Sequence, residues 1–413
     1  MTQPPRDPAV TCCVVGGGPG GLMTAYLLAR AGVDVALFET HQDFDREFRG
    51  DSLHPGTLEL LDHLGLADEL LTLDHYRARY FRLHTPTGSY TTTDYGRLRT
   101  KFNYVALMAQ SAFLEFLASK GSELSHFTLR QSTRATGIVT NKDNVVTGVR
   151  YQDGQGQERE QPAKLVIAAD GRFSRFRRLA DLPARPLGAS SDLLWFQLPK
   201  RPNDPPDADV SLYFGVGHYV ALLGRTNSWQ VGYTIPKGAY AATRERGVEP
   251  IRAFVEQYVP WLSDRTSLLT DWSQITLLSV EIARVDTWHR PGLLLIGDAA
   301  HVISPVGGNG ILMAIQDAIV TANVLVPRLR NGGTVDSRDL ARIQNEREPA
   351  IVAVQRMQVR VEQRTALTLQ TGKAFRPSPA FRLFTRVPYL RGRSARANAY
   401  GPRTPRLDPT LLA

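Results

Sequence analysis

Three glycines near the start of the chain have the spacing of a turn that binds a nucleotide. Gly16, Gly18 and Gly21 follow a short β-prone run and precede a stretch rich in alanine and leucine. Glycines at these positions let the backbone turn sharply and approach a pyrophosphate, whose charge the N-terminus of the next helix stabilises. Glu39 ends the following apolar run, about where an acidic side chain binds ribose hydroxyls. We therefore expect a βαβ unit that binds a dinucleotide.

A second glycine-rich segment could hold a flat ring and a polyol chain. Gly297 and Asp298 come directly after an apolar run, at the place where open α/β sheets bind ligands. An aspartate there can accept hydrogen bonds from a polyol. Gly308 and Gly310 let backbone amides approach a flat ring, and a helix that begins near Gly310 directs its positive end toward the bound group. Pro305 lies in the same segment.

A third motif, Asp170-Gly171-x-x-Ser174-x-x-Arg177, follows another apolar run. By itself it has two interpretations. It is either a further part of the ligand site or an Asp-Gly turn followed by a helix whose N-cap is Ser174.

In order and spacing the three motifs resemble the para-hydroxybenzoate hydroxylase-like, or class A, flavoprotein monooxygenases. This family includes ubiquinone-pathway hydroxylases and antibiotic-tailoring enzymes, and the resemblance covers about residues 10–330. It implies FAD as the cofactor, NAD(P)H as the reductant and O₂ as a co-substrate. It also implies that Arg49 contacts FAD, that Gln110 reaches its ribityl and phosphate portion, and that Asp298 binds the ribityl chain. Asp170 would serve both flavin and pyridine nucleotide.

Two positions depart from the pattern of the relatives. Asn309 and Leu312 stand where relatives often have glutamine and asparagine. The start of the helix near the flavin is therefore more apolar than usual. We expect backbone contacts to the flavin to survive here.

The resemblance implies an oxygen-transfer reaction. NAD(P)H would reduce FAD, and O₂ would form a flavin hydroperoxide that hydroxylates or epoxidises a small hydrophobic substrate, which is aromatic, polyketide or isoprenoid. The alternatives on the same fold are a prenyl-chain reductase or dehydrogenase, a flavin halogenase and a non-catalytic flavin-binding module. The segment 229–236 lacks the second tryptophan of the halogenase motif.

No catalytic base stands out in the sequence. His54 and His301 lie beside the cofactor motifs, and Pro305 lies between two of the glycine groups. A histidine in such a place is more often a structural partner than a proton shuttle. We therefore take these three residues only as weak candidates for a catalytic role.

The elements that must position the motifs predict an α/β fold: a Rossmann-like FAD-binding domain, an inserted and mainly antiparallel substrate domain, and a C-terminal helical segment. Five aromatic residues of the insert either line the substrate or fill the core, namely Trp195, Tyr213, Phe214, Tyr219 and Tyr233. The expected FAD-binding domain comprises residues 1–75, 100–186 and 287–330. The substrate domain comprises 76–99 and 187–286, followed by C-terminal helices over 331–372 and a basic tail over 373–413.

Composition excludes several classes of protein. The 413 residues are 42% hydrophobic and 22% charged, which is ordinary for a globular protein. No apolar run approaches the length of a membrane span, and no secretory signal precedes the first motif, so we expect a cytoplasmic protein. Cys12 and Cys13 are adjacent and should pack as small apolar side chains. We expect no metal site.

The net charge of +9 is concentrated in the tail. Nine cationic residues lie between Lys373 and Arg406, with no acidic residue among them, so the rest of the chain is close to neutral. A nucleic-acid-binding surface is therefore not expected. The tail is either an arm that covers the protein's own acidic surface or a peripheral contact with an anionic membrane, such as the inner membrane surface.

Overall fold

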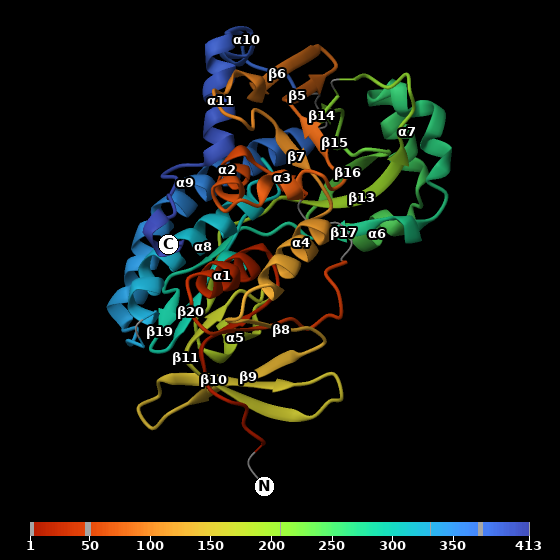
Figure 1. Ribbon diagram of the computed structural model, residues 1–413. Helices are drawn as coiled ribbons and strands as arrows, with labels where there is room; N and C mark the ends of the chain where they lie inside the picture. The colour runs from red at the N-terminus through yellow and green to blue at the C-terminus, as the bar shows by residue number, and fades with distance from the viewer. Residues whose placement is uncertain (1–3, 46–50, 207, 331, 371–374, 413) are drawn as a thin grey trace.

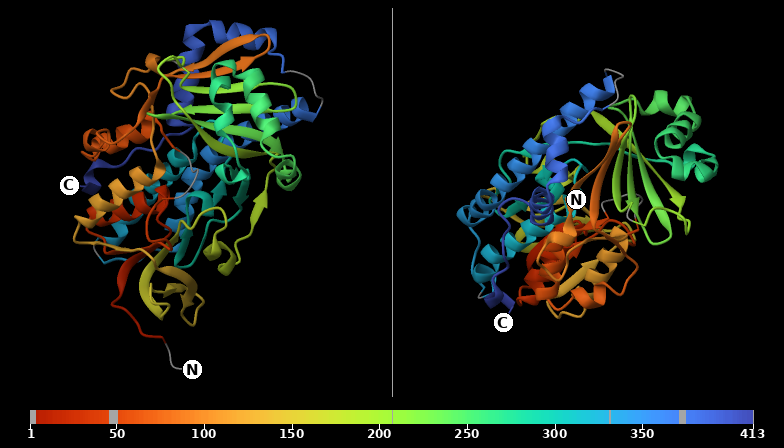
Figure 2. Two further views of the ribbon diagram at one scale, coloured as in Figure 1. Left: turned by 90° about the vertical axis from the view of Figure 1, so that its right-hand side faces the viewer. Right: turned by 90° about the horizontal axis from the view of Figure 1, so that it is seen from above.

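Two β-sheets, one toward each end of the molecule, form the frame of the fold (Figures 1 and 2). They are seen in a computed structural model that describes residues 4–45, 51–206, 208–330, 332–370 and 375–412. Arg49 therefore lies outside the described residues.

The first sheet has a core of five parallel strands in the order β8-β2-β1-β11-β20. The sequence of β1 is almost entirely apolar, as is usual for a parallel strand whose two faces are both covered. Cys12 and Cys13 point to opposite faces, and each is a buried free thiol, as predicted. The strands are β1 (Val10–Val15), β2 (Val35–Phe38), β8 (Phe127–Arg130), β11 (Glu158–Ala168) and β20 (Leu293–Leu295), with the antiparallel β9 (Arg134–Thr140), β10 (Val146–Gln152) and β19 (His289–Arg290) at the margins.

Helices α1, α4 and α8 cover one face of the first sheet. α1 begins at Pro19, because proline is well suited to the first helical position. Two short helices, α2 and α3, follow His54 and are separated at Gly65, whose φ of +74° ends the first. The bounds are α1 (Pro19–Arg30), α2 (Pro55–His63), α3 (Ala67–Leu70), α4 (Gln110–Ser122), α5 (Arg175–Leu179) and α8 (Gly310–Leu329).

The second sheet has seven strands in the order β17-β13-β16-β15-β14-β5-β6. All neighbours are antiparallel except β14 and β5, which are parallel. Its outer face packs against α7 (Glu249–Tyr258) and the 3-10 helix η2 (Pro260–Leu268). The strands are β5 (Tyr80–Thr85), β6 (Gly88–Asp94), β13 (Ser191–Pro199), β14 (Val210–Phe214), β15 (Tyr219–Gly224), β16 (Ser228–Pro236) and β17 (Thr276–Leu278); α6 (Tyr240–Glu245) and η3 (Trp272–Gln274) lie between strands of this sheet in the chain.

Two small sheets join the large ones. One has the order β3-β7-β4 and the other β12-β18-β21. They place two short 3-10 helices at the junction between the large sheets. Their elements are β3 (Ser52–Leu53), β4 (Tyr76–Ala78), β7 (Val105–Leu107), β12 (Ala184–Pro186), β18 (Ala283–Val285), β21 (His301–Val302), η1 (Tyr95–Arg97) and η4 (Gly297–Ala299).

The C-terminal region is helical throughout most of its length and lies along one flank of both sheets (Figure 2). Where the sequence predicted C-terminal helices, the described residues 332–370 contain one long helix, α9 (Ser337–Gln370). The basic tail folds into α10 (Pro379–Arg386), α11 (Pro388–Tyr400) and η5 (Pro409–Leu412).

The tail packs on the protein through apolar contacts and hydrogen bonds. The ring of Phe375 lies 4.9 Å from that of Phe214, and Ala395 and Ala399 are fully buried. Within the described parts of the chain, no tail arginine forms an ion pair with an acidic side chain, so the packing of the tail does not depend on paired charges.

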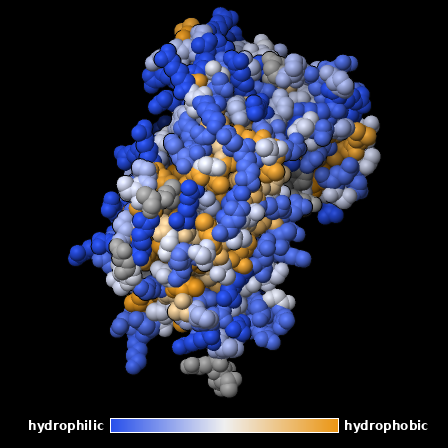
Figure 3. All heavy atoms as spheres, in the orientation of Figure 1, coloured by the Kyte–Doolittle hydropathy of each residue, from blue (hydrophilic) through white to orange (hydrophobic). Residues whose placement is uncertain are grey.

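By length and composition alone α8 could cross a membrane, contrary to our expectation from the sequence. However, 83% of its most apolar stretch is buried inside the protein, since α8 packs against α1 and α9. Figure 3 shows a largely hydrophilic surface, with apolar side chains gathered toward the middle of the face in view.

Candidate cofactor and substrate site

A cavity of about 1320 Å³ lies at the junction of the two large sheets. Its walls combine the three glycine motifs of the first sheet with side chains of the second. A pocket for one small molecule has roughly 300–1000 Å³. The cavity is therefore large enough for an extended cofactor and a second ligand.

The first glycine turn forms one end of this cavity. Gly16 has a φ of +104°, and a Cβ there would lie 2.5 Å from the carbonyl oxygen of Ala169, so only glycine fits. A Cβ at Gly21 would collide with the carbonyl oxygen of Gly16, which explains why Gly21 is needed although it does not line the cavity. A Cβ at Gly18 would meet nothing within 4 Å. Gly18 thus keeps open the space that a pyrophosphate would need.

Glu39 shapes the same end of the cavity. It is buried, and its carboxylate accepts hydrogen bonds from the backbone N–H groups of Gly17 at 2.8 Å and His41 at 3.0 Å. The carboxylate also lines the cavity. It both holds the turn and presents an acceptor where a ribose would lie.

The Asp170 motif caps a short helix and also borders the cavity. Ser174 caps α5 by accepting from the N–H of Arg177 at 2.9 Å, and Asp170 accepts from the hydroxyl of Ser174 and from the N–H groups of Arg175 and Phe176. Asp170 and Gly171 also line the cavity. The segment that caps α5 therefore also forms part of the cavity wall.

The Gly297–Asp298 loop and the start of α8 form another part of the wall. Asp298 and Pro305 line the cavity, and Gly308 has a φ of +66°. A Cβ at Gly310 would meet nothing within 4 Å, so the first turn of α8 is open to a ligand. This open backbone is what a flat ring would require.

A buried cluster of three side chains holds that loop from behind. Asp317 accepts from the N–H of Gly297 at 2.9 Å, contacts Nε2 of His301 at 2.6 Å and accepts from Nε of Arg347 at 2.8 Å. All three side chains are almost fully buried. Burial raises the pKa of Asp317, but His301 and Arg347 outweigh it and lower the pKa to about 2. His301 does not line the cavity, and we assign it this structural role.

His54 lies at the cavity wall and contacts the glycine loop. Its Nε2 is 3.2 Å from the carbonyl oxygen of Gly308, and its Nδ1 has no partner among the described residues. Burial lowers the pKa of His54 to about 4. The ring is therefore neutral at pH 7 and supports the loop by donating a hydrogen bond from Nε2.

Most of the residues that the sequence predicted for the site line this cavity. Gly21 and His301 lie behind its wall. The two departures from the family pattern, Asn309 and Leu312, are buried and do not line it. The lining group consists of Gly16, Gly18, Glu39, His54, Gln110, Asp170, Gly171, Gly297, Asp298, Pro305, Gly308 and Gly310.

The sequence reasoning missed two polar pairs in the cavity wall. Asp51 forms an ion pair with Arg225, which lies in the turn between β15 and β16. Burial raises the pKa of Asp51 to about 6, although Arg225 lowers it. Asn398 of α11 donates from Nδ2 to the hydroxyl of Tyr95 at 2.5 Å. The only sequence feature that pointed to Asp51 as a site residue was its position two residues after Arg49. No sequence feature pointed to Asn398.

The second sheet supplies an apolar ceiling to the cavity. Of the five aromatic candidates, Trp195 and Tyr219 line it, whereas Tyr213 and Tyr233 pack in the core of the outer face. Phe214 packs against the tail residue Phe375. We use the name ceiling for the cavity-lining residues of this sheet, which are Phe81, Leu193, Trp195, Val210, Leu212, Tyr219, Ala221, Leu223, Gln230 and Thr276–Leu278.

The cavity thus combines glycine turns that suit a dinucleotide with an apolar ceiling that suits a hydrophobic ligand. The chain belongs to the family described as "FAD binding domain", whose sequence profile matches residues 9–358. The predicted family, the FAD cofactor and the class of enzyme are thereby confirmed. NAD(P)H is the typical reductant in this family.

Several proteins of this kind are similar to the chain. It is 34% identical over 419 residues to 6-methylpretetramide 4-monooxygenase of Streptomyces rimosus, covering 100% of this chain and 98% of that protein. It is 28% identical over 352 residues to aklavinone 12-hydroxylase DnrF of Streptomyces peucetius, covering 78% and 68%. The structure of OxyS anhydrotetracycline hydroxylase from Streptomyces rimosus has the same fold, with a TM-score of 0.72, 20% identity, and coverage of 95% and 76%. The chain is an FAD-dependent monooxygenase.

Asp298→Ala should weaken FAD retention without unfolding the protein. A charged hydrogen-bond acceptor at a ligand contributes about 1.5–3 kcal/mol, so we expect a dissociation constant roughly 10- to 100-fold higher. Titration of the apoprotein with FAD, followed by flavin fluorescence, measures this. Asp143→Ala, which changes an exposed aspartate in the turn between β9 and β10, is the control. Equal FAD affinities in the two variants would contradict the assignment of Asp298.

Proposed function

We propose that this enzyme hydroxylates a flat, multi-ring aromatic phenol of the polyketide type. The observation that carries the proposal is the shape of the ceiling. Trp195 stands opposite Gly232 in the pairing of β13 with β16, and a Cβ at Gly232 would lie 2.8 Å from two carbons of the indole ring. The indole therefore lies flat across Gly232 and offers a planar surface to a ligand.

The ceiling is also wide. Pairing places Leu223, Val210 and Phe81 in one row across β15, β14 and β5, and Ala221 and Leu212 in the next. With strands about 4.8 Å apart, the row from β16 to β5 spans about 14 Å. A surface of this width fits several fused rings better than one.

The relatives support the same substrate class. By their names, the full-length relative acts on 6-methylpretetramide and another acts on aklavinone. The similarity to a monooxygenase over the full length favours oxygen transfer over the reductase, halogenase and non-catalytic alternatives.

For the cofactor we propose that the open backbone at Gly18 and Gly310 takes the pyrophosphate and the flavin ring. Glu39 would bind the ribose and Asp298 the ribityl chain, and Gln110 and Asp170 would contact the part between them. FAD, when bound, supplies the redox chemistry by which NAD(P)H and O₂ deliver one oxygen atom. The protein positions the ring between the glycine loop and the ceiling and excludes water from it.

Substrate preference tests the proposal. The holoenzyme is offered a tetracyclic polyketide phenol, a single-ring phenol and a farnesyl compound in turn, and NAD(P)H consumption and product mass are followed. We expect stimulation, and a product heavier by one oxygen atom, with the tetracycle. Oxygenation of the farnesyl compound with none of the tetracycle would refute the proposed substrate class.

A second candidate function, peripheral contact with an anionic membrane, is favoured by the outer face of the tail. Leu383 and Tyr389 are 64% and 67% exposed, and Arg382, Arg386 and Arg393 are exposed near them. Exposed apolar side chains among arginines suit the surface of an anionic bilayer, where each cation contributes about 1 kcal/mol.

Vesicle binding should therefore be measurable and sensitive to salt. We expect the protein to co-sediment with phosphatidylserine vesicles at low salt and to be released at high salt. Leu383→Glu together with Arg386→Glu should abolish binding. The control is Leu268→Glu together with Arg252→Glu, placed on the outer side of the second sheet. No sedimentation of the wild type at low salt would leave the tail with a structural role alone.

A further inference from the structure

We propose that Gln230 is a specificity-determining residue that hydrogen-bonds an oxygen substituent on the edge of the substrate. This inference rests on the proposed function, because it concerns how the ceiling recognises a multi-ring phenol. Gln230 is 3% exposed and lines the cavity. Within the part of the chain that the structure describes, its amide makes no hydrogen bond with the protein. Buried amides are nearly always paired, so this one is available to a ligand.

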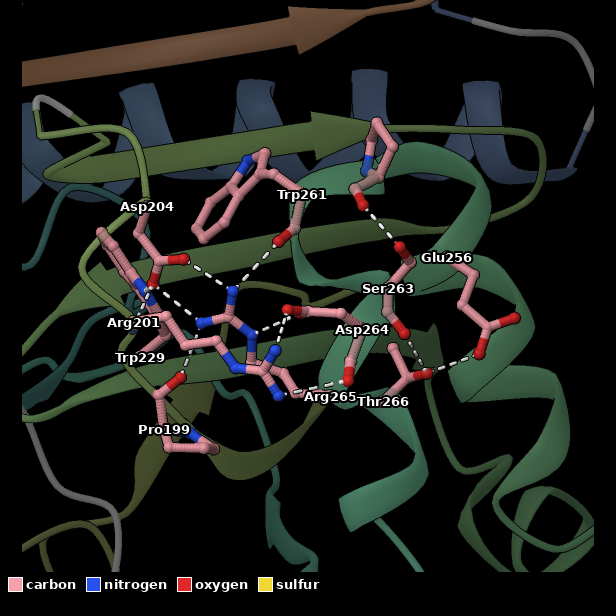
Figure 4. Close-up of polar contacts among 11 residues, drawn as sticks. Pro199, Arg201, Asp204, Trp229, Glu256, Trp261, Ser263, Asp264, Arg265 and Thr266 are labelled. Atoms are coloured by element: carbon pink, nitrogen blue, oxygen red, sulfur yellow. Dashed lines mark hydrogen bonds and ion pairs between the residues drawn. The ribbon is translucent and has the colours of Figure 1, made fainter.

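The fold fixes the direction in which Gln230 points. Side chains alternate along β16, so Trp229 and Val231 belong to the core of the outer face and Gln230 faces the cavity. On the outer face the indole N–H of Trp229 donates to Asp204 at 2.7 Å, and Asp204 forms a buried ion pair with Arg265 at 2.6 Å (Figure 4). These contacts hold β16 in register from behind. The amide is therefore presented to the cavity by a rigid strand.

Gln230 stands at one end of an apolar row. Strand pairing aligns it with Leu223, Val210 and Phe81, all of which line the cavity. The row continues to Thr93 on β6, beside which Tyr95 and its partner Asn398 form the polar group at the far end. A ligand lying along the row meets hydrocarbon in the middle and hydrogen-bonding groups at its ends.

The chemistry of the amide defines what it can recognise. A glutamine side chain donates two hydrogen bonds from its NH₂ group and accepts at its oxygen. It therefore fits a ring carbonyl, a phenol or a carboxamide at the edge of a flat polycycle. A saturated hydrocarbon chain offers no such group. Gln230 thus favours oxygenated aromatic substrates over prenyl chains.

The row also contains a matched control. Gln197 on β13 is paired directly with Gln230, but it is exposed and does not line the cavity. Gln230→Leu and Gln197→Leu make the same chemical change at neighbouring positions of one row. A third variant, Gln230→Glu, keeps the size of the side chain and, when ionised, loses both donors.

The experiment measures binding to the FAD-loaded enzyme without NAD(P)H, through the change in flavin absorbance. The probes are 1,8-dihydroxyanthraquinone, in which three oxygens share one edge, and anthracene, which has none. For the anthraquinone we expect Gln230→Leu to raise the dissociation constant about five- to tenfold, the usual worth of a hydrogen bond. Gln197→Leu should leave it unchanged. The Gln230→Leu variant should bind anthracene with the same dissociation constant as the wild type or a lower one.

Further readouts separate recognition from stability. We expect Gln230→Leu to keep its FAD and to unfold at the wild-type temperature or above, because an apolar side chain suits the ceiling. Gln230→Glu should bind the anthraquinone more weakly at pH 8 than at pH 5, where the buried carboxyl is protonated and can donate. If Gln230→Leu and the wild type bind the anthraquinone with equal affinity, the proposed role of Gln230 is refuted, but the proposed substrate class is not. Failure of the wild type to bind either polycycle would instead overturn the proposed substrate class.

Discussion

Arg347→Met is expected to reduce the free energy of unfolding by about 3–5 kcal/mol, the usual cost of removing one partner from a buried ion pair. Methionine fills a similar volume, so the loss comes from the charge. Asp317 would keep only His301 and the N–H of Gly297 as partners in a site without water access. Because Asp317 holds the Gly297–Asp298 loop, FAD should also dissociate more readily.

Chemical denaturation and release of flavin fluorescence measure the two effects. Arg342→Met, an exposed position on the same helix, is the control and should change stability by less than about 0.5 kcal/mol. Since the pKa of Asp317 is lowered to about 2, its contribution should be complete above about pH 4 and lost as the pH falls toward 2. A loss below 1 kcal/mol at pH 7 would show that the cluster does not support the loop.

The protein should also lose stability as the pH falls from 6.5 to 4, owing to His54. The folded state lowers the pKa of His54 to about 4, whereas the unfolded chain keeps it near 6.5. Between these values the unfolded state binds more protons, so lowering the pH favours unfolding, by up to about 3 kcal/mol at pH 4. Below pH 4 both states are protonated, and this contribution stops changing.

Unfolding by urea at several pH values tests this. His54→Gln retains a donor toward Gly308 but cannot be protonated, so its stability should change less over the same range. His63→Gln, at an exposed position on α2, should follow the wild type. If His54→Gln and wild type show the same pH dependence, another group carries the acid sensitivity.

The sequence alone predicted those parts of the cavity wall that depend on short segments of the chain. Gly16, Gly18 and Gly21 lie within six residues, and a Cβ at Gly16 or Gly21 would collide with the backbone, so the turn depends on this short segment alone. Asp170 and Asp298 each follow a buried strand directly. Parallel strands end at one edge of the sheet, so these motifs had to converge on one cavity.

Other parts of the site depend on contacts that no local pattern encodes. The ceiling depends on strand register, which places Trp195 over Gly232 and Gln230 beside Leu223. Asn398 and Tyr95 are separated by 303 residues, and a basic sequence rich in proline gave no sign that α11 would reach the cavity. His301 is a catalytic candidate in the sequence only because it lies beside a cofactor motif, whereas its side chain turns back toward Asp317.

The position of α11 limits how these enzymes can be recombined. Asn398 contacts Tyr95, which follows β6, while Ala395 and Ala399 pack into the same junction. A chimera that takes residues 187–286 from a relative to acquire its substrate range would leave that junction with ill-matched partners. We therefore expect that segments 76–99, 187–286 and 375–400 must be exchanged together, because crossover points at 330 or 370 would separate surfaces that pack against each other.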